Sequence, residues 1–231
     1  MQKIFTDYYL FLKTGKTTRY NNELKPDLIF QFGRLFLLFE IIFFAALIVI
    51  FIFVIIVHPP KNETQKWIET LSPVWAFLIT GIIGPLVEEF TYRYWLKATK
   101  LTLCLSSLFV SYILTNNIIN SYYYRVDDTF TLELAISFGI AAFMYFALSF
   151  NKVLSFIQKF WEKNALILIW ISILWFGFGH IKNFPLEGWQ YLYAPIMVLP
   201  QLAMGTVLAF GRLKYGILFP ILVHMIHNSI L

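Results

Sequence analysis

Residues 30–57 read FQFGRLFLLFEIIFFAALIVIFIFVIIV, and this stretch contains only two charged side chains, Arg34 and Glu40. An α-helix rises about 1.5 Å per residue, so roughly 20 apolar residues cross the hydrocarbon core of a bilayer. The stretch is long enough to do so. It is also far longer than the apolar region of a signal peptide, which has about 7–15 residues. The sequence therefore predicts a membrane helix here, and we expect no removable signal peptide.

Composition extends this conclusion to the whole chain. Of its 231 residues, 59% are hydrophobic and 13% are charged, whereas a soluble domain carries about 25% charged residues. Lipid must therefore be the solvent for most of the chain. The net charge of +5 is small for a nucleic-acid binder, so we expect no nucleic-acid partner. The single cysteine, Cys104, excludes an internal disulfide and a cysteine-rich metal site.

Apolar segments with polar breaks recur along the sequence. Backbone groups in hydrocarbon must be satisfied within their own segment, which predicts a helix for each one. The segments are residues 30–57, 71–96, 101–119, 130–150, 164–182, 190–210 and 213–231, and the clearest breaks are residues 58–62, 125–128 and 183–185. The predicted fold is all-α, a polytopic bundle of about seven transmembrane helices. We expect residues 30–231 to form one domain, preceded by a basic amphipathic segment at residues 1–29 that lies on the membrane surface.

The distribution of Lys and Arg gives the orientation. With seven spans and a cytoplasmic N-terminus, the inner side holds six basic residues in residues 1–34 and eight more in residues 93–100, 152–163 and 212–214. These fourteen compare with four on the outer side, Lys61, Lys66, Arg125 and Lys182. Cytoplasmic loops of membrane proteins carry such an excess of basic residues. The charges therefore predict a cytoplasmic N-terminus.

Ionisable side chains inside membrane helices are costly and by default mark a function. The second segment carries Glu88, Glu89 and Arg93. On a helix, Glu89 and Arg93 are four positions apart and pair across one turn. Glu88 lies about 100° round the helix from Glu89, so the same arginine cannot easily neutralise both. We expect Glu89 to be held structurally and Glu88 to be available for chemistry, the alternative being two acids near the headgroups.

Two later segments carry the remaining polar groups. His180 closes the sequence Trp-Phe-Gly-Phe-Gly-His in the fifth segment, where the glycines would let another helix approach closely. In the last segment, His224 and Asn228 are four positions apart and share a face, and His227 lies about 60° from His224. Glu40 in the first segment has no assigned role beyond packing or a substrate path.

Prolines stand close to two of these sites. Pro85 precedes Glu88 by three residues, and Pro220 precedes His224 by four. Each proline removes a helix hydrogen bond and tends to kink the helix. A kink beside polar groups favours a water-accessible pocket.

These residue types suit hydrolysis of an amide by water. No serine or cysteine has a recognisable nucleophile setting, so bound water is the expected nucleophile. A glutamate in a poorly solvated pocket is a useful base, and Glu88, helped by His180, could activate the water. Donors from His224 and Asn228 could then stabilise the oxyanion.

Three motifs resemble those of the CPBP intramembrane proteases, which include the CAAX prenyl endopeptidases and the bacterial Abi or bacteriocin-processing proteins. They are Glu-Glu-x-x-x-Arg at 88–93, Phe-x-x-x-His at 176–180 and His-x-x-x-Asn at 224–228. The resemblance covers residues 72–231 and implies that Glu88 and His180 activate water. It also implies an oxyanion site at His224 and Asn228, with Glu89 and Arg93 as a supporting ion pair and Phe176 as part of its motif.

The chain departs from the family pattern in two places. Tyr94 stands where the family often has glycine, and 92 residues separate Glu88 from His180. We interpret the excess as an inserted helical hairpin around residues 101–150. A further tension concerns depth, because the segment limits place Glu88 near the inner side of the membrane and His180 near the outer side.

Two other interpretations remain open. Glu88, His180, His224 and His227 could bind zinc, although no His-Glu-x-x-His pattern is present; we expect no metal and no cofactor. Alternatively, the chain is a transporter or a scaffold without catalysis. As a CPBP-type protease it would take a membrane-associated peptide or protein as substrate, lipidated if the CAAX resemblance holds, and would lie in the cytoplasmic membrane of a prokaryotic cell.

Overall fold

The computed structural model of the protein describes residues 1–17, 28–119 and 128–230, and every regular element among them is a helix. The elements are α1 (Gln2–Thr14), α2 (Leu28–Val57), α3 (Glu63–Ile68), α4 (Pro73–Ala76), η1 (Phe77–Ile83), α5 (Gly84–Tyr92), η2 (Tyr94–Leu96), α6 (Lys100–Ile119), α7 (Phe130–Ala147), α8 (Asn151–Lys163), α9 (Ala165–Gly179), η3 (His180–Asn183), η4 (Gly188–Tyr193), α10 (Ala194–Met197), α11 (Leu199–Tyr215) and α12 (Leu218–Ile230). The predicted all-α membrane bundle is confirmed. Part of the predicted N-terminal segment (residues 18–27) and most of the predicted break at 125–128 lie outside the described residues.

The number of spans is close to the prediction of about seven. Within the described residues, five helical stretches are long and apolar enough to cross a membrane: Ile29–Val57, Pro73–Leu96, Lys100–Ile118, Phe130–Ala147 and Ala165–Asn183. A sixth, Gly188–Met197 with Leu199–Tyr215, is bent by 40°, where Pro195 and Pro200 begin the short helix α10 and the long helix α11. The protein is thus an integral, multi-pass membrane protein.

The seventh predicted segment, residues 213–231, is shorter than expected. Its first residues complete α11, and Gly216 turns the chain with φ 100° before α12 begins. The 13 residues of α12 rise about 20 Å, less than the roughly 30 Å of a hydrocarbon core. α12 therefore carries its polar groups inside the bundle without spanning the membrane by itself.

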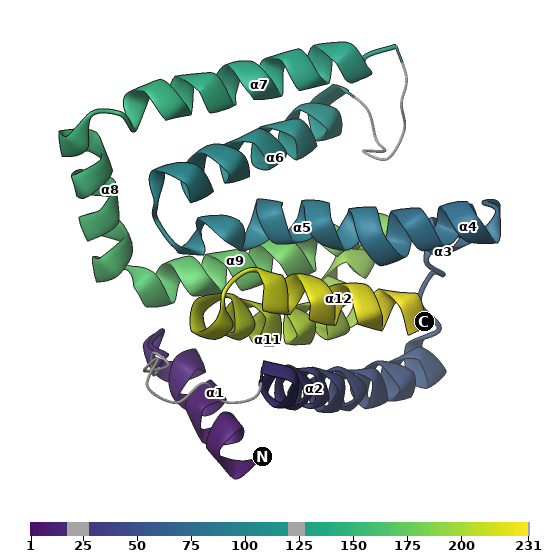
Figure 1. The fold of residues 1–231 in the computed structure, drawn as a ribbon. Helices are drawn as coiled ribbons and strands as arrows, with labels where there is room; N and C mark the ends of the chain where they lie inside the picture. The colour runs from purple at the N-terminus through teal and green to yellow at the C-terminus, as the bar shows by residue number, and fades with distance from the viewer. Residues whose placement is uncertain (18–27, 120–127, 231) are drawn as a thin grey trace.

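The long helices lie side by side, with α11 in their midst (Figure 1). α11 packs against α2, α9 and α12, and its nine residues from Met204 to Arg212 are all buried. A helix that is enclosed on all sides belongs to the core of a bundle. α11 is thus the platform on which the helices carrying the polar motifs are assembled.

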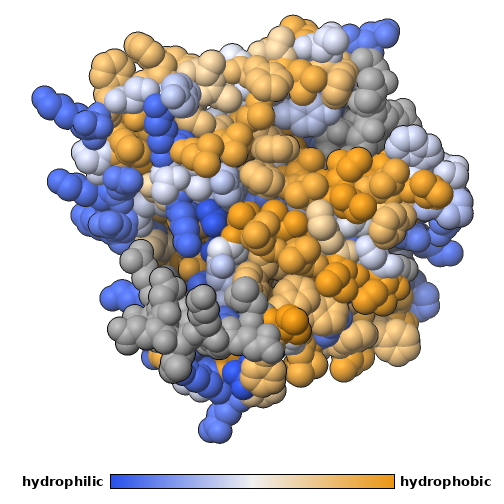
Figure 2. Space-filling model, viewed as in Figure 1, coloured by the Kyte–Doolittle hydropathy of each residue, from blue (hydrophilic) through white to orange (hydrophobic). Residues whose placement is uncertain are grey.

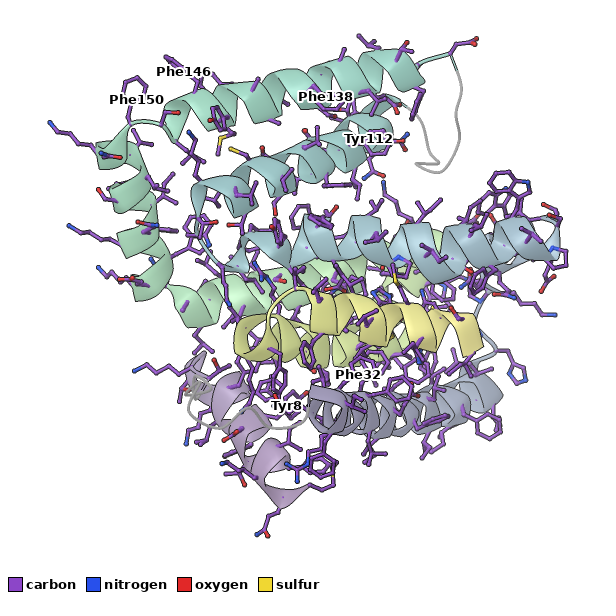
Figure 3. The ribbon with its side chains drawn as sticks, viewed as in Figure 1. Tyr8, Phe32, Tyr112, Phe138, Phe146 and Phe150 are labelled. Atoms are coloured by element: carbon purple, nitrogen blue, oxygen red, sulfur yellow. The ribbon has the colours of Figure 1, made fainter. Side chains whose placement is uncertain are left out.

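Helices α6 and α7 pack on one another as a hairpin at one edge of the bundle (Figure 1). The buried carboxylate of Glu133 on α7 accepts hydrogen bonds from Asn116 Nδ2 and Thr129 Oγ1, each at 3.1 Å. The far face of α7 carries exposed aromatic side chains, and Phe146 and Phe150 project from its end in Figure 3. This face is therefore suited to lipid; that the hairpin is an insertion stays a prediction.

Two helices lie across one end of the bundle, α8 and α1 (Figure 1). Hydrophilic side chains gather at that end, while apolar side chains cover the band beside it (Figure 2). α1 buries Ile4, Tyr8 and Phe11 and contacts α11, α2 and α9, and Figure 3 shows Tyr8 on its inner side. Its predicted apolar face is thus covered by the protein itself.

Candidate active site

Helix α5 carries an ion pair with no exposure to solvent. Arg93 Nη1 donates to Glu89 Oε1 at 2.5 Å, and both side chains are 0% exposed. The guanidinium carbon of Arg93 also lies 3.9 Å from the centroid of the Phe176 ring. A buried charge pair of this kind is costly unless its remaining groups are satisfied. Among the described residues, Glu89 Oε2 and Arg93 Nε and Nη2 have no hydrogen-bond partner, whereas Glu89 Oε1 is also contacted from another helix.

His224 on α12 bridges the two carboxylates of α5. Its Nδ1 lies 3.1 Å from Glu89 Oε1, and its Nε2 lies 3.6 Å from Glu88 Oε2. Because the Glu89 carboxylate is paired with Arg93 and accepts only, Nδ1 carries the proton of that hydrogen bond. Nε2 is consequently the nitrogen that faces Glu88.

His180 approaches Glu88 from the other side. Its Nε2 lies 3.9 Å from Glu88 Oε1, and its Nδ1 lies 2.8 Å from the backbone carbonyl of Phe176. A carbonyl only accepts, so Nδ1 donates and Nε2 again faces the carboxylate. Glu88 thus stands between the Nε2 atoms of two imidazoles, and both separations exceed direct hydrogen-bond contact.

Phe176 packs against Arg93 of the charged pair and against both imidazoles. Its ring is fully buried and lies edge-on to His180 and His224, with centroids 4.9 Å and 5.9 Å apart. The ring therefore fixes both imidazoles by packing. Gly177 beside it lets α9 approach α11, because a Cβ there would lie 3.3 Å from the Cα of Leu202 and closer still to the Leu202 side chain.

The depth difference expected between Glu88 and His180 is absent, and the alignment of two helices explains why. Ser172 Oγ donates to the carbonyl of Tyr92 at 2.6 Å, which sets antiparallel α9 and α5 so that Glu88 lies level with about Phe176. Side chains on a helix lean toward its N-terminus. The side chains of Glu88 and His180 therefore lean toward one another, which bridges the remaining separation of one helical turn along the helix axes.

Asn228 lies one turn beyond His224 on α12. Its Nδ2 donates to the backbone carbonyl of Thr80 in η1 at 3.0 Å. η1 is a π-helical stretch of seven residues, a conformation that is rare and frequent at functional sites. Asn228 is thus tied to the same chain segment that leads into Glu88.

His227 belongs to a different cluster. Its Nδ1 lies 3.0 Å from Glu40 Oε1 on α2, and its ring lies against Phe39 and Phe43, with centroids 4.8 Å and 4.3 Å apart. The four-ligand zinc set suggested by the sequence is therefore not gathered. Over the described ranges, no three His, Cys, Asp or Glu side chains are arranged to hold a metal ion.

Accessibility within the site is graded. Glu89, Arg93 and His224 have side chains that are at most 2% exposed, whereas Glu88 is 11% and His180 19% exposed. The buried Glu89–Arg93 pair can hold charge and orientation, and the more exposed Glu88 and His180 can meet a small molecule. This division matches the needs of a site where a buried scaffold supports an accessible base.

Several contacts around the site were not predicted from the sequence. They include the Glu40–His227 pair, the Thr80 carbonyl on Asn228, and the buried Arg212, whose Nη2 donates to the carbonyl of Tyr94 at 2.9 Å. Pro85 was the only signal for any of them, since a proline frees a carbonyl one turn earlier in its helix. The others depend on which helices become neighbours.

Comparison with known proteins gives one match. The family described as Type II CAAX prenyl endopeptidase Rce1-like matches residues 70–230, a range that contains Glu88, His180, His224 and Asn228. No curated protein and no solved structure matches the chain. Because the family match covers more than half of the 231 residues, the chain belongs to the Rce1-like type II CAAX prenyl endopeptidases, a family of membrane-embedded proteases.

Proposed function

We propose that the protein hydrolyses a peptide bond near the C-terminus of a membrane-associated, lipidated protein, with water as the nucleophile and without a metal. The observation that carries the proposal is the position of Glu88 between His180 Nε2 at 3.9 Å and His224 Nε2 at 3.6 Å. Family membership supports a CAAX-type endopeptidase. The lipid on the substrate and the cytoplasmic membrane of a prokaryotic cell as its location are parts of the proposal.

The reaction begins with a proton transfer. Glu88, assisted by His180, takes a proton from water, and the oxygen adds to the scissile carbonyl carbon. The charge that develops on the carbonyl oxygen is then met by donors. In its protonated form, His224 donates through Nδ1 to Glu89 and through Nε2 to this oxyanion, and Asn228 supplies a second donor.

Collapse of the tetrahedral intermediate completes the step. The C–N bond breaks, and the proton held by Glu88 passes to the leaving amine, which leaves the carboxylate ready for the next cycle. The proton taken from water is thus returned to the product. Burial of Glu89, Arg93 and His224 supports the charges without reorganisation during the reaction.

The test uses purified protein in vesicles and a peptide ending in a CAAX sequence whose cysteine carries a prenyl thioether. Glu88→Gln should lower the rate of cleavage by about 10²-fold or more, the usual range for loss of a general base. Glu162→Gln, at an exposed position on α8, is the matched control and should cleave like the wild type. Full activity of Glu88→Gln would exclude the proposed mechanism.

Two further measurements test the zinc mechanism and the choice of substrate. Elemental analysis of the purified protein, with activity assayed in chelator, distinguishes water activated by glutamate from water activated by zinc; loss of activity in chelator that zinc restores would favour the zinc mechanism. The same peptide without its lipid tests the substrate class. Equal cleavage of both peptides would contradict selection of lipidated substrates.

A further inference from the structure

The amide of Asn228 has a fixed orientation. A backbone carbonyl only accepts hydrogen bonds, so the atom 3.0 Å from the Thr80 oxygen must be Nδ2. One of the two N–H groups of Nδ2 is thereby occupied. The second N–H points about 120° away in the plane of the amide and remains a donor.

The Thr80 carbonyl is free because of two neighbouring residues. In an α-helix its donor would be the N–H of Gly84, but that group donates to the carbonyl of Ile79, as the i to i+5 pattern of η1 requires. Continuing that pattern would make residue 85 the donor to Thr80. Residue 85 is a proline, which has no N–H. The carbonyl is therefore left to accept from another helix.

A close approach of η1 to α12 makes the contact possible. Gly81 is buried, and a Cβ there would lie 2.8 Å from Ser229 Oγ. These two residues follow Thr80 and Asn228 directly in the chain. A Cβ at position 81 would force either the Ser229 side chain or α12 to move, next to the point where the Asn228 hydrogen bond forms.

We propose that η1 is a positioning device for the oxyanion donor: the π-helical register and Pro85 together free the Thr80 carbonyl, which holds Asn228 so that its second N–H meets the developing oxyanion. The inference rests on the proposed function and deepens it. A donor held before the reaction stabilises charge without reorganising, and loss of one such donor costs about 10²–10³-fold in kcat. The Thr80 hydroxyl is not part of the device, since it donates to the Ala76 carbonyl at 2.7 Å.

The first test distinguishes two properties of Pro85, its lack of a backbone N–H and the presence of its ring. Pro85→Ala restores an N–H, which competes for the Thr80 carbonyl. Pro85→lactic acid, the α-hydroxy analogue of alanine, removes the ring equally but brings no N–H. We expect kcat for cleavage of the prenylated peptide to fall about tenfold or more in Pro85→Ala, with KM unchanged, and to stay near wild type in Pro85→lactic acid.

Lactic acid also replaces the amide after Gly84 by an ester, which makes the Gly84 carbonyl a weaker acceptor. This side effect would lower the activity of the lactic acid variant, so it cannot produce the expected difference. Equal activities of the two variants would overturn the inference. If both are low, loss of the proline ring is the cause, and if both are high, Pro85 has no effect on the rate. In the double variant Pro85→Ala with Asn228→Ala, the two losses should not multiply, since both remove one donor. Multiplying losses would likewise overturn the inference.

The second test uses the Gly81 contact and covers a failure of the first variants to fold. Gly81→Ala should lower kcat about tenfold or more, and adding Ser229→Ala, which removes the Oγ atom at 2.8 Å, should restore it. Ser229→Ala alone is the control and should be near wild type. Failure of the rescue in a folded protein would count against the device.

The two proposals fail in different ways. If the protein is no glutamate protease, the wild type shows no cleavage or Glu88→Gln remains active. If only the positioning role is wrong, Glu88→Gln is inactive while the paired variants at positions 85 and 81 behave alike.

Discussion

His224 Nδ1 lies 3.1 Å from Glu89 Oε1, across 135 positions of sequence, and the same oxygen receives a hydrogen bond from Arg93. One carboxylate oxygen thus connects α12 to the ion pair of α5. A carboxylate on Nδ1 fixes the tautomer and the orientation of an imidazole. In the proposed mechanism, Glu89 would therefore act through His224, as a positioning residue.

Replacing Glu89 by Gln tests this relationship. The amide keeps the shape of the carboxylate, and its oxygen can still accept from Arg93 and from His224 Nδ1, but it removes the negative charge that stabilises the protonated His224 of the proposed mechanism. We expect kcat to fall on the order of 10²-fold or more with little change in KM, by analogy with loss of the orienting acid in a catalytic triad. Steady-state cleavage of the prenylated peptide measures both constants. A raised KM with unchanged kcat would show that Glu89 serves binding alone.

Gly177 should be essential for packing of α9 on α11. A Cβ at this position would meet the Leu202 side chain and lie 3.3 Å from the Leu202 Cα, so Gly177→Ala should lower the free energy of unfolding by about 1–3 kcal/mol through overpacking. Thermal unfolding in detergent measures the change.

Gly139 provides the matched control, because nothing lies within 4 Å of a Cβ added there. Gly139→Ala, within α7, should be neutral or stabilise the protein by up to about 1 kcal/mol, since alanine loses less conformational freedom in a helix. Equal destabilisation by the two variants would contradict a specific contact at Gly177.

Sequence reasoning succeeded where chemistry depends on local spacing or on the solvent. Lipid forces each apolar segment into a helix, and the four-residue spacing of Glu89 and Arg93 predicts their ion pair. The same spacing puts His224 and Asn228 on one face of α12. These relationships need no knowledge of which helices are neighbours.

Sequence reasoning failed where the result depends on how helices are aligned with one another. The Ser172–Tyr92 hydrogen bond sets the levels of Glu88 and His180, and no local pattern reports it. The partner of Glu40 lies 187 positions away in His227, so its role could not be assigned. The predicted segment 213–231 is longer than α12 because the sequence stays apolar on both sides of the turn at Gly216.

The Glu40–His227 pair should stabilise the fold more than it serves catalysis. It joins α2 to α12 at 3.0 Å, and His227 Nε2 is buried and has no hydrogen-bond partner among the described residues. Glu40→Leu should lower the free energy of unfolding by about 1–3 kcal/mol, because His227 Nδ1 loses its acceptor as well.

Replacing both residues by leucine should cost less than the two single changes together, since no polar group is then left unpaired. Thermal unfolding of the four proteins of this cycle measures the coupling. His227→Leu should keep most of the cleavage activity, in contrast to His224→Ala. A loss as large as that of His224→Ala would place His227 in the catalytic group or among zinc ligands.

Docking of α1 should depend on pH through Tyr8, whose hydroxyl lies 2.5 Å from Thr206 Oγ1. Burial raises the pKa of Tyr8 above its ordinary 10.0. The docked helix therefore binds the phenolic proton more tightly than the undocked one, so this stabilisation is full below pH 10 and is lost as the pH rises through the raised pKa. A nitroxide at the exposed position 9 (Tyr9→Cys) should become more mobile above about pH 10.

Tyr8→Phe is the control, because it keeps the ring contact with Phe210 but cannot ionise. Its nitroxide mobility should change less over this range. The Asp7–Lys214 ion pair is present in both proteins, and an equal rise in both would exclude Tyr8 as the cause.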